Sequence, residues 1–450
     1  MTKDNPNVRE LALYVLTEVT DRGEYSNHVL KNVLEKYQYM EKRDRAFLSR
    51  LCEGTLEQLI RIDDVLNRFS KVPVKKMKPV IRGILRLGVY QLLFMDSVPD
   101  AAVCNESVKL ATRKGFYNLK GFVNGVLRSI AREKDKALTV TGTGADYLSV
   151  RYSMPLWIVK KWLAVYPEET VERLLAAFLE PASTYIRCNS SRISPEALLT
   201  RLQAEGAQAE QAGFVPDALR LTRFDYLEAL PSFGEGLFQV QDASSMLPAY
   251  VAAPKAGDRC LDICAAPGGK SLQLADLLSG TGSVEARDLT EYKLELLEDN
   301  IARSGFSNIT ARQWDATIPD PSMKGQADVV LADLPCSGLG VLGRKKDIRY
   351  RVQEEDLHAL AALQRQILTC AADYVKPGGT LVYSTCTINK EENEENLCWF
   401  TAHFPFEPVS LDDRLPEALK SETTKDGYLQ LLPGTHPCDG FFLAKLRRGV

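Results

Sequence analysis

Apolar residues in the first 130 positions of the chain recur at helical spacing. One apolar stripe runs from Val8 to Val19, and a second long helical region runs from Phe47 to Phe69. A lysine- and proline-rich break at 71–79 precedes an almost wholly apolar stretch at 80–94, which is typical of a buried helix. Spacing of three and four residues buries one helix face against its neighbours. The pattern therefore predicts an all-α N-terminal domain over residues 1–140.

The next hundred residues mix the two periodicities. Residues 131–145 are charged and then rich in Thr and Gly, as expected of a linker. A helix is predicted from Pro155, a strand over 184–189, and a further helix that Ser194 caps. We expect a small α+β connector domain over 145–238.

Short apolar runs alternate with helical patterns through the rest of the chain. The predicted strands are 260–264, 282–288, 309–313, 327–333 and 378–385. This alternation favours a parallel sheet with helices on both faces. The expected C-terminal domain, residues 239–450, is thus of the α/β Rossmann-like type.

The loop after the first of these strands is the main candidate for a binding site. Glycines let a ligand approach the backbone closely, and the following helix directs free N–H groups at it. A simple turn is the alternative explanation of the glycine pair, and the loop matches neither G-x-G-x-x-G nor a phosphate loop. The loop residues are Cys264, Ala265, Ala266, Pro267, Gly268, Gly269 and Lys270.

Two acids could complete an adenosine site. Asp288 ends the second strand, where a carboxylate can bind ribose hydroxyls, although it could also be an exposed turn acid. Asp315 follows the third strand and could accept a hydrogen bond from an adenine amino group, whereas its neighbour Trp314 could belong to the core. With no phosphate loop present, this set favours S-adenosylmethionine over ATP as the cofactor.

The chain has ten cysteines, and two of them follow predicted strands. Cys336 lies just beyond Asp333, which ends its strand, and Cys386 follows the last strand, so both should open into one cleft. Cys52, Cys104 and Cys370 are expected to be buried small apolar residues. No CxxC pair occurs and no histidine directly adjoins a cysteine, so we expect reduced thiols, no metal, and a cytoplasmic protein.

Neither a membrane span nor a secretion signal is predicted. No apolar run reaches the length of about 18 residues that a span requires, and the first six residues are polar. Charge is uneven, because residues 1–140 hold 25 Lys and Arg against 17 Asp and Glu, while the remainder holds 31 against 42. The excess of basic residues in the N-terminal region suggests a polyanion partner, although a solvated helical surface would have the same composition. The candidate phosphate contacts are Lys71, Lys75, Lys76, Lys78, Arg82 and Arg86.

The N-terminal region resembles the NusB-type helical RNA-binding domain. The resemblance rests on three segments, Arg82–Leu92, Val98–Ala111 and Phe122–Arg128. It implies binding to RNA or packing on partner proteins.

The C-terminal region is similar to RNA cytosine-5 methyltransferases of the Sun/Fmu and nucleolar-protein type. The matching motifs are Asp262–Ser271, Asp333–Gly340, Thr385–Thr387, Glu391–Glu394 and a closing strand at Asp439–Ala444. Together with the NusB-like front, they narrow the resemblance to the bacterial branch that acts on small-subunit (16S) ribosomal RNA. One departure is Gly343–Tyr350, where two lysines replace an expected Asn- or His-Pro pair.

This resemblance implies residue roles. Cys386 would add to C6 of a cytosine so that C5 can take the methyl group, and Cys336 would assist elimination of the RNA adduct. Asp333 would border the cofactor and hold the base, while Lys270 would position Asp333 or favour a thiolate, unless it is only a solvated helix-start lysine. The target base would be unstacked or come from a loop. Four basic residues would hold the RNA backbone near it: Arg344, Lys345, Lys346 and Arg349.

Two other functions remain open at this point. One is an RNA-binding assembly or antitermination factor whose methyltransferase domain is vestigial. The other is an amino-group methyltransferase, although such enzymes usually carry an Asn/Asp-Pro-Pro-aromatic motif where this chain has Asp333-Leu334-Pro335-Cys336. We expect a monomer that acts on small-subunit ribosomal RNA.

Overall fold

The computed structural model describes residues 7–450; the polar segment 1–6, noted above for lacking an apolar leader, lies outside them. The chain forms two compact units. One holds the chain up to Glu180 together with Leu342–Val352, and the other holds Pro181–Val341 together with Gln353–Val450. These two units are defined by how the chain packs in space. The domain limits 1–140, 145–238 and 239–450 stay predictions.

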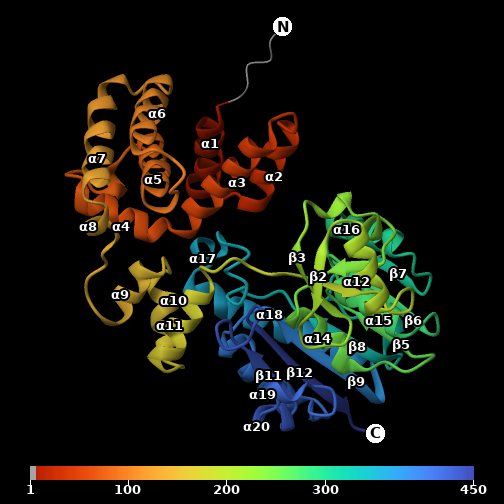
Figure 1. Ribbon diagram of the computed structural model, residues 1–450. Coiled ribbons are helices and arrows are strands. Elements are labelled where there is room, and N and C mark those ends of the chain that lie inside the picture. The colour runs from red at the N-terminus through yellow and green to blue at the C-terminus, as the bar shows by residue number, and fades with distance from the viewer. Residues whose placement is uncertain (1–6) are drawn as a thin grey trace. The chain divides into compact units, whose positions relative to one another are not determined.

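The first unit is helical, as its periodicity predicts (Figure 1). The expected helical region at 47–69 is two helices, because the chain breaks at Gln58 between α3 and α4. Helix α5 is buried along most of its length, and Gly88 lets it approach α7, since a Cβ there would lie 2.7 Å from Leu127 Cδ2. The helices are α1 Val8–Arg22, α2 Ser26–Lys36, α3 Lys42–Glu57, α4 Leu59–Phe69, α5 Pro79–Phe94, α6 Asp100–Arg113, α7 Lys120–Arg132, α8 Lys134–Leu138, α9 Gly144–Arg151, α10 Leu156–Leu163 and α11 Glu168–Ala177.

The segment Leu342–Val352 belongs to this first unit, although it lies far along the sequence. It contains the short helix α17 (Ile348–Arg351). Arg349 is 0% exposed and donates to the carbonyl oxygens of Ser153 (3.1 Å) and Leu342 (2.9 Å). The prediction that Arg349 holds an RNA phosphate is therefore wrong, because its guanidinium satisfies buried backbone carbonyls instead.

The second unit begins with a small antiparallel sheet in the order β2-β3-β1-β4. Its strands are β1 Thr184–Cys188, β2 Gln208–Gln211, β3 Ala218–Arg223 and β4 Phe238–Val240. Helix α12 (Pro195–Ala204) packs Leu198 and Leu202 into the same core as Ile186, and Ser194 Oγ accepts from the Ala197 N–H at 3.2 Å. The predicted strand and capped helix are thus confirmed.

The larger sheet has the order β10-β12-β9-β8-β5-β6-β7, with β11 paired to β12. Strands β5 to β9 are parallel, as predicted, whereas β10, β11 and β12 are antiparallel. The prediction of a wholly parallel sheet is therefore wrong for β10, β11 and β12. The chain runs from β11 to β12 without the crossover helix that parallel neighbours require. The strands are β5 Arg259–Asp262, β6 Ser283–Asp288, β7 Ile309–Gln313, β8 Ala327–Asp333, β9 Val375–Thr385, β10 Phe406–Pro408, β11 Tyr428–Leu431 and β12 Phe441–Arg448.

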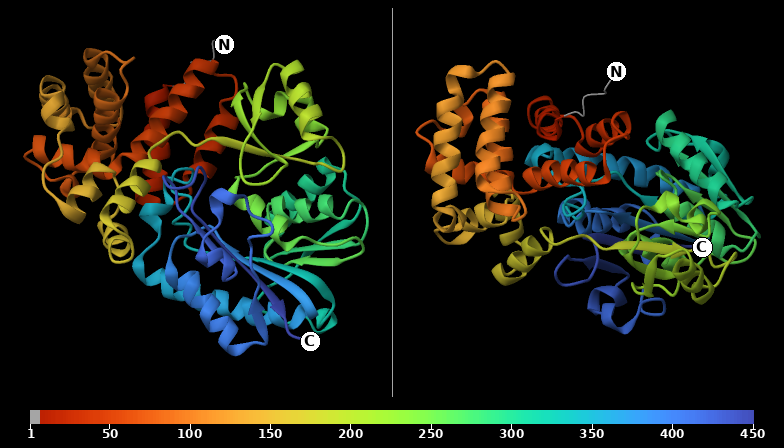
Figure 2. Two further views of the ribbon diagram at one scale, coloured as in Figure 1. Left: turned by 60° about the horizontal axis from the view of Figure 1, so that its bottom comes forward. Right: turned by 45° about the horizontal axis from the view of Figure 1, so that its top comes forward.

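Helices cover both faces of this sheet, and the two views of Figure 2 show the sheet between them. Alternate strand residues supply the two cores: Cys260 packs on one side and Leu261 on the other. The first core includes α14 Leu247–Ala252, α15 Gly269–Leu277 and α16 Glu291–Ser304, and the second includes α18 Glu354–Tyr374 and α19 Glu394–His403.

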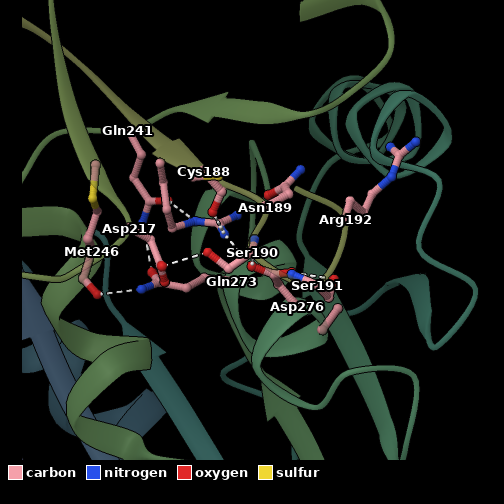
Figure 3. Close-up of polar contacts among 12 residues, drawn as sticks. Cys188, Asn189, Ser190, Ser191, Arg192, Asp217, Gln241, Met246, Gln273 and Asp276 are labelled. Atoms are coloured by element: carbon pink, nitrogen blue, oxygen red, sulfur yellow. Dashed lines mark hydrogen bonds and ion pairs between the residues drawn. The ribbon is translucent and has the colours of Figure 1, made fainter. Parts of the chain in front are cut away.

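A buried polar cluster joins the small sheet to helix α15 (Figure 3). Arg187 on β1 donates to Asp276 Oδ2 and to Gln241 Oε1, both at 3.1 Å. Asp276 also accepts from the backbone N–H groups of Ser190 (3.0 Å) and Ser191 (2.9 Å). Because a buried charge is tolerated only when it is paired and hydrogen-bonded, this cluster fixes the connector against the helix that follows the glycine loop.

Candidate active site

The candidate residues gather where the parallel strands end. Asp262, Asp288 and Asp333 are the last residues of β5, β6 and β8, and Thr385 is the last residue of β9. The carboxyl ends of parallel strands share one edge of the sheet, which is where α/β folds bind ligands.

The glycine loop has the predicted strand–loop–helix form. Gly268 lies at φ +106°, a conformation that favours glycine, and precedes the first residue of α15. A Cβ on Gly268 would lie 2.6 Å from Leu297 Cδ1. The Ala265 N–H donates to the Arg287 carbonyl at 2.7 Å, so the loop lies across the end of β6.

Asp288 is held beneath this loop. Its carboxylate accepts from the N–H groups of Ala266 (2.9 Å) and Leu289 (2.8 Å) and pairs with Lys293 at 3.0 Å. Only 4% of Asp288 is exposed, which excludes the alternative of an exposed turn acid. Asp315 accepts from the Thr317 hydroxyl (2.6 Å) and N–H (2.9 Å), and these hydrogen bonds lower the pKa of Asp315.

Asp262 is a buried acid that the sequence analysis assigned no role. It is 1% exposed and accepts from the Ser271 hydroxyl at 2.6 Å. Burial raises the pKa of Asp262 to about 7. The signal in the sequence was an acid inside the apolar run 260–264, directly before the glycine loop; the strand itself ends at Asp262.

Lys270 and Asp333 form an ion pair, with Nζ 2.7 Å from Oδ2. Lys270 also donates to Ser245 Oγ at 2.7 Å, and the Ser384 hydroxyl donates to Asp333 Oδ1 at 2.7 Å. Burial opposes the charged form of Lys270, but the Asp333 carboxylate outweighs it and raises the pKa of Lys270. With 12% of its side chain exposed, Lys270 is not the solvated lysine of the alternative reading. Ser245 and Ser384 were missed because nothing local marks them.

The two candidate thiols are in contact, with Cys336 Sγ 3.3 Å from Cys386 Sγ. This hydrogen bond, together with burial, raises the pKa of the Cys336 thiol well above its usual range. The loops carrying the thiols are joined through the Gly340 N–H, which donates to the Cys386 carbonyl at 3.0 Å. Gly340 is required there, since a Cβ would lie 2.1 Å from the Gly440 carbonyl oxygen. Cys52, Cys104 and Cys370 are buried, as predicted.

Residues 7–450 contain no group of three or more His, Cys, Asp or Glu arranged to hold a metal ion. Within the same range, every helix is too short or too polar to cross a membrane.

This fold, with a glycine loop between strand and helix and an antiparallel end to its sheet, defines an α/β methyltransferase. The family described as 16S rRNA methyltransferase RsmB/F matches residues 249–447. The NusB family matches residues 6–132, and the ferredoxin-like domain of the RsmF/B-like methyltransferases matches residues 154–225.

Curated relatives match the whole chain. The probable ribosomal RNA small subunit methyltransferase B of Bacillus subtilis is 37% identical, covering 98% of this chain and 99% of the relative. The corresponding Synechocystis protein is 32% identical and likewise covers 98% of this chain and 99% of the relative. The chain therefore belongs to the ribosomal RNA small subunit methyltransferase B family.

Two solved structures share this fold. The crystal structure of PH0851 has a TM-score of 0.81 at 25% identity and covers 98% of this chain and 99% of its own. The structure of NSun6 from Pyrococcus horikoshii with SFG has a TM-score of 0.57 at 25% identity, covering 64% of this chain and 97% of its own.

Proposed function

We propose that this protein transfers a methyl group from S-adenosylmethionine to C5 of a cytosine in 16S ribosomal RNA, through a covalent bond between Cys386 and C6. The observation that carries the proposal is the contact of the Cys336 and Cys386 thiols beside the Lys270–Asp333 ion pair. An amino-group methyltransferase needs no thiol in its site, and two touching thiols serve no purpose there.

The cofactor would be held by the loop Cys264–Lys270, with Asp288 on the ribose and Asp315 on the adenine. The residues fit such a group, because the loop leads directly into the N-terminus of α15, and Asp288 is held directly beneath that loop. When bound, S-adenosylmethionine supplies an electrophilic methyl group.

Cytosine C5 becomes nucleophilic when the Cys386 sulfur adds to C6, because the new C6–S bond pushes electron density to C5. After C5 has taken the methyl group, a solvent water molecule accepts the C5 proton, the electron pair of the C5–H bond restores the ring double bond, and the C6–S bond breaks with its electrons going to the Cys386 sulfur. Cys336 remains a neutral thiol, since its pKa is raised, and it can donate a hydrogen bond to the departing Cys386 sulfur. Asp333, fixed by Lys270 and Ser384, would hold the base at N3 or its amino group.

Bisulfite sequencing of 16S ribosomal RNA from cells with and without the gene tests the product. We expect one cytosine that resists bisulfite conversion in the wild type to be converted when the gene is deleted. No change at any cytosine would refute the proposal.

Two variants test the chemistry in vitro. Cys386→Ala should abolish methylation, and Cys336→Ala should leave enzyme joined to RNA through denaturation. Activity retained in Cys386→Ser would instead favour an amino-group methyltransferase, and cofactor binding without methyl transfer by the wild type would favour a vestigial domain. We expect a monomer, which light scattering in solution tests.

A further inference from the structure

Glu392 is a fully buried carboxylate that the mechanism above does not use. It lies in the turn Lys390–Glu392 and is 0% exposed. Its oxygens accept from the Ser337 N–H (2.8 Å), the Ser337 hydroxyl (2.5 Å) and the Gln364 amide (3.0 Å). The Asn389 amide donates to it as well, at 3.1 Å.

All four groups that contact the Glu392 carboxylate, two of them on Ser337, are hydrogen-bond donors. Only a group with two acceptor oxygens satisfies such a set, so a carboxylate is suited to the position and a neutral amide is not. Burial raises the pKa of Glu392, and the hydrogen bonds from Ser337, Asn389 and Gln364 oppose that rise.

The carboxylate is connected to both thiol loops. Ser337 directly follows Cys336, and its hydroxyl lies 2.8 Å from the hydroxyl of Thr387, which directly follows Cys386. Both loops have further support, because the Gly340 N–H of one donates to the Cys386 carbonyl of the other, Thr385 pairs with Phe442 on β12, and the Gln364 amide donates to the Pro335 carbonyl at 2.9 Å. The Glu392 side chain bonds directly to Ser337, the neighbour of Cys336, and reaches Thr387 through the Ser337 hydroxyl.

We propose that Glu392 is a positioning residue that holds the Cys336 thiol against the Cys386 sulfur for the release of methylated RNA. The inference rests on the proposed function, in which Cys336 acts at release and Cys386 at addition. Its consequence is selective: losing the Glu392 contacts should slow release more than methyl transfer.

The test substitutes Glu392→Gln, which places an NH₂ donor opposite the Ser337 donors and leaves a buried group unpaired. With S-adenosylmethionine and 16S RNA, we expect enzyme–RNA adduct on a denaturing gel at about tenfold the wild-type level, since a small misplacement of a reacting group is costly. Single-turnover methyl transfer should stay within about threefold of wild type, while steady-state kcat falls about tenfold or more. Glu392→Asp, which keeps a carboxylate, should recover part of the release rate.

Glu391→Gln is the matched control. Glu391 is the preceding residue, its side chain is 20% exposed, and it pairs with His358 at 2.5 Å. It should accumulate no adduct. If Glu392→Gln does not fold, Ser337→Ala removes the hydroxyl contact from the other side and should trap adduct in its place.

The outcomes separate the two claims. If Cys336→Ala traps adduct while the folded Glu392 or Ser337 variants do not, the positioning role is refuted and the proposed function stands. If Cys336→Ala itself traps none, the assignment of Cys336 to release fails, and this inference fails with it. A general loss of stability would lower methyl transfer and release together, without adduct.

Discussion

Lys270 Nζ lies 2.7 Å from Asp333 Oδ2, so an ion pair joins the start of α15 to the end of β8. The pair links the glycine loop to the strand that leads to Cys336. The Lys270 charge also interacts with Cys386. The Lys270 ammonium group thus interacts both with Asp333, proposed to hold the base, and with Cys386, proposed to attack it.

Replacing Lys270 by Met should lower kcat/KM for RNA methylation about 100-fold, because the Asp333 carboxylate loses its partner and Cys386 loses a nearby positive charge. Steady-state methylation assays measure this. The control is Lys376→Met, which removes an ion pair of the same length, 2.7 Å to Asp328, near the start of β8. Equal losses in the two variants would show that Lys270 acts only through stability.

Stability should depend on pH through Asp262. Its pKa is about 7 in the folded protein against an ordinary value of 3.8, so the folded state binds this proton more tightly than the unfolded state. The contribution is therefore fully present below about pH 4 and is lost as pH rises to about 7, amounting to about 3 kcal/mol between pH 5 and 8. Urea unfolding at both pH values should show a smaller decline for Asp262→Asn than for wild type. Parallel declines would contradict the burial effect.

Asp347 should cap a helix that begins 321 residues earlier in the chain. Helix α2 starts at Ser26 without a side-chain cap from Tyr25, and Asp347 instead accepts from the Ser26 N–H (3.2 Å) and hydroxyl (2.7 Å). Asp347→Ala should cost about 1 kcal/mol and speed amide exchange in Ser26–Lys36, as loss of a cap does. Hydrogen exchange with mass spectrometry measures this, and Asp347→Asn, which keeps one acceptor, should exchange more slowly than the alanine variant. Unchanged exchange in the alanine variant would refute the cap.

A basic hollow in the helical unit should contribute to RNA binding. A cavity of about 710 Å³ is lined by Lys71, Lys75, Arg82 and Arg86 among others, and the two arginines also line a second cavity of about 470 Å³. Replacing Lys71 and Lys75 together by Ala should weaken RNA binding and reduce the slope of log Kd against log salt by about 1–2, through lost phosphate contacts.

The control for that experiment removes the same charge elsewhere in the helical unit. Lys109 and Lys136 are both exposed. Lys109 pairs with Glu106 on the same helix, α6, and Lys136 on α8 pairs with Glu133, the residue just before that helix. Their double alanine variant should leave the salt slope unchanged. A slope that falls equally in both variants would mean that only net charge matters.

Local patterns in the sequence determined much of the fold and of the site. Apolar runs identify β6 and β8 with the acids at their ends, and they identify β5 as well, although β5 ends at Asp262 and not at Cys264 as predicted. Glycine marks the Gly268 turn. Both signals are local, because the spacing of buried residues and a left-handed backbone depend on a few neighbouring residues. The same reasoning placed Cys336 and Cys386 after strands that lie side by side in a parallel sheet.

Only the tertiary structure decided which distant side chains meet. Glu392 beneath Ser337, Arg349 inside the helical unit and the antiparallel strand β12 all depend on segments far apart in the chain. Arg349 follows the basic run Arg344–Lys346 and therefore looks like a surface residue in the sequence, whereas packing places it in the interior. The sequence specifies which groups are available, whereas the register of strands and the packing of returning segments fix the distances at which those groups act.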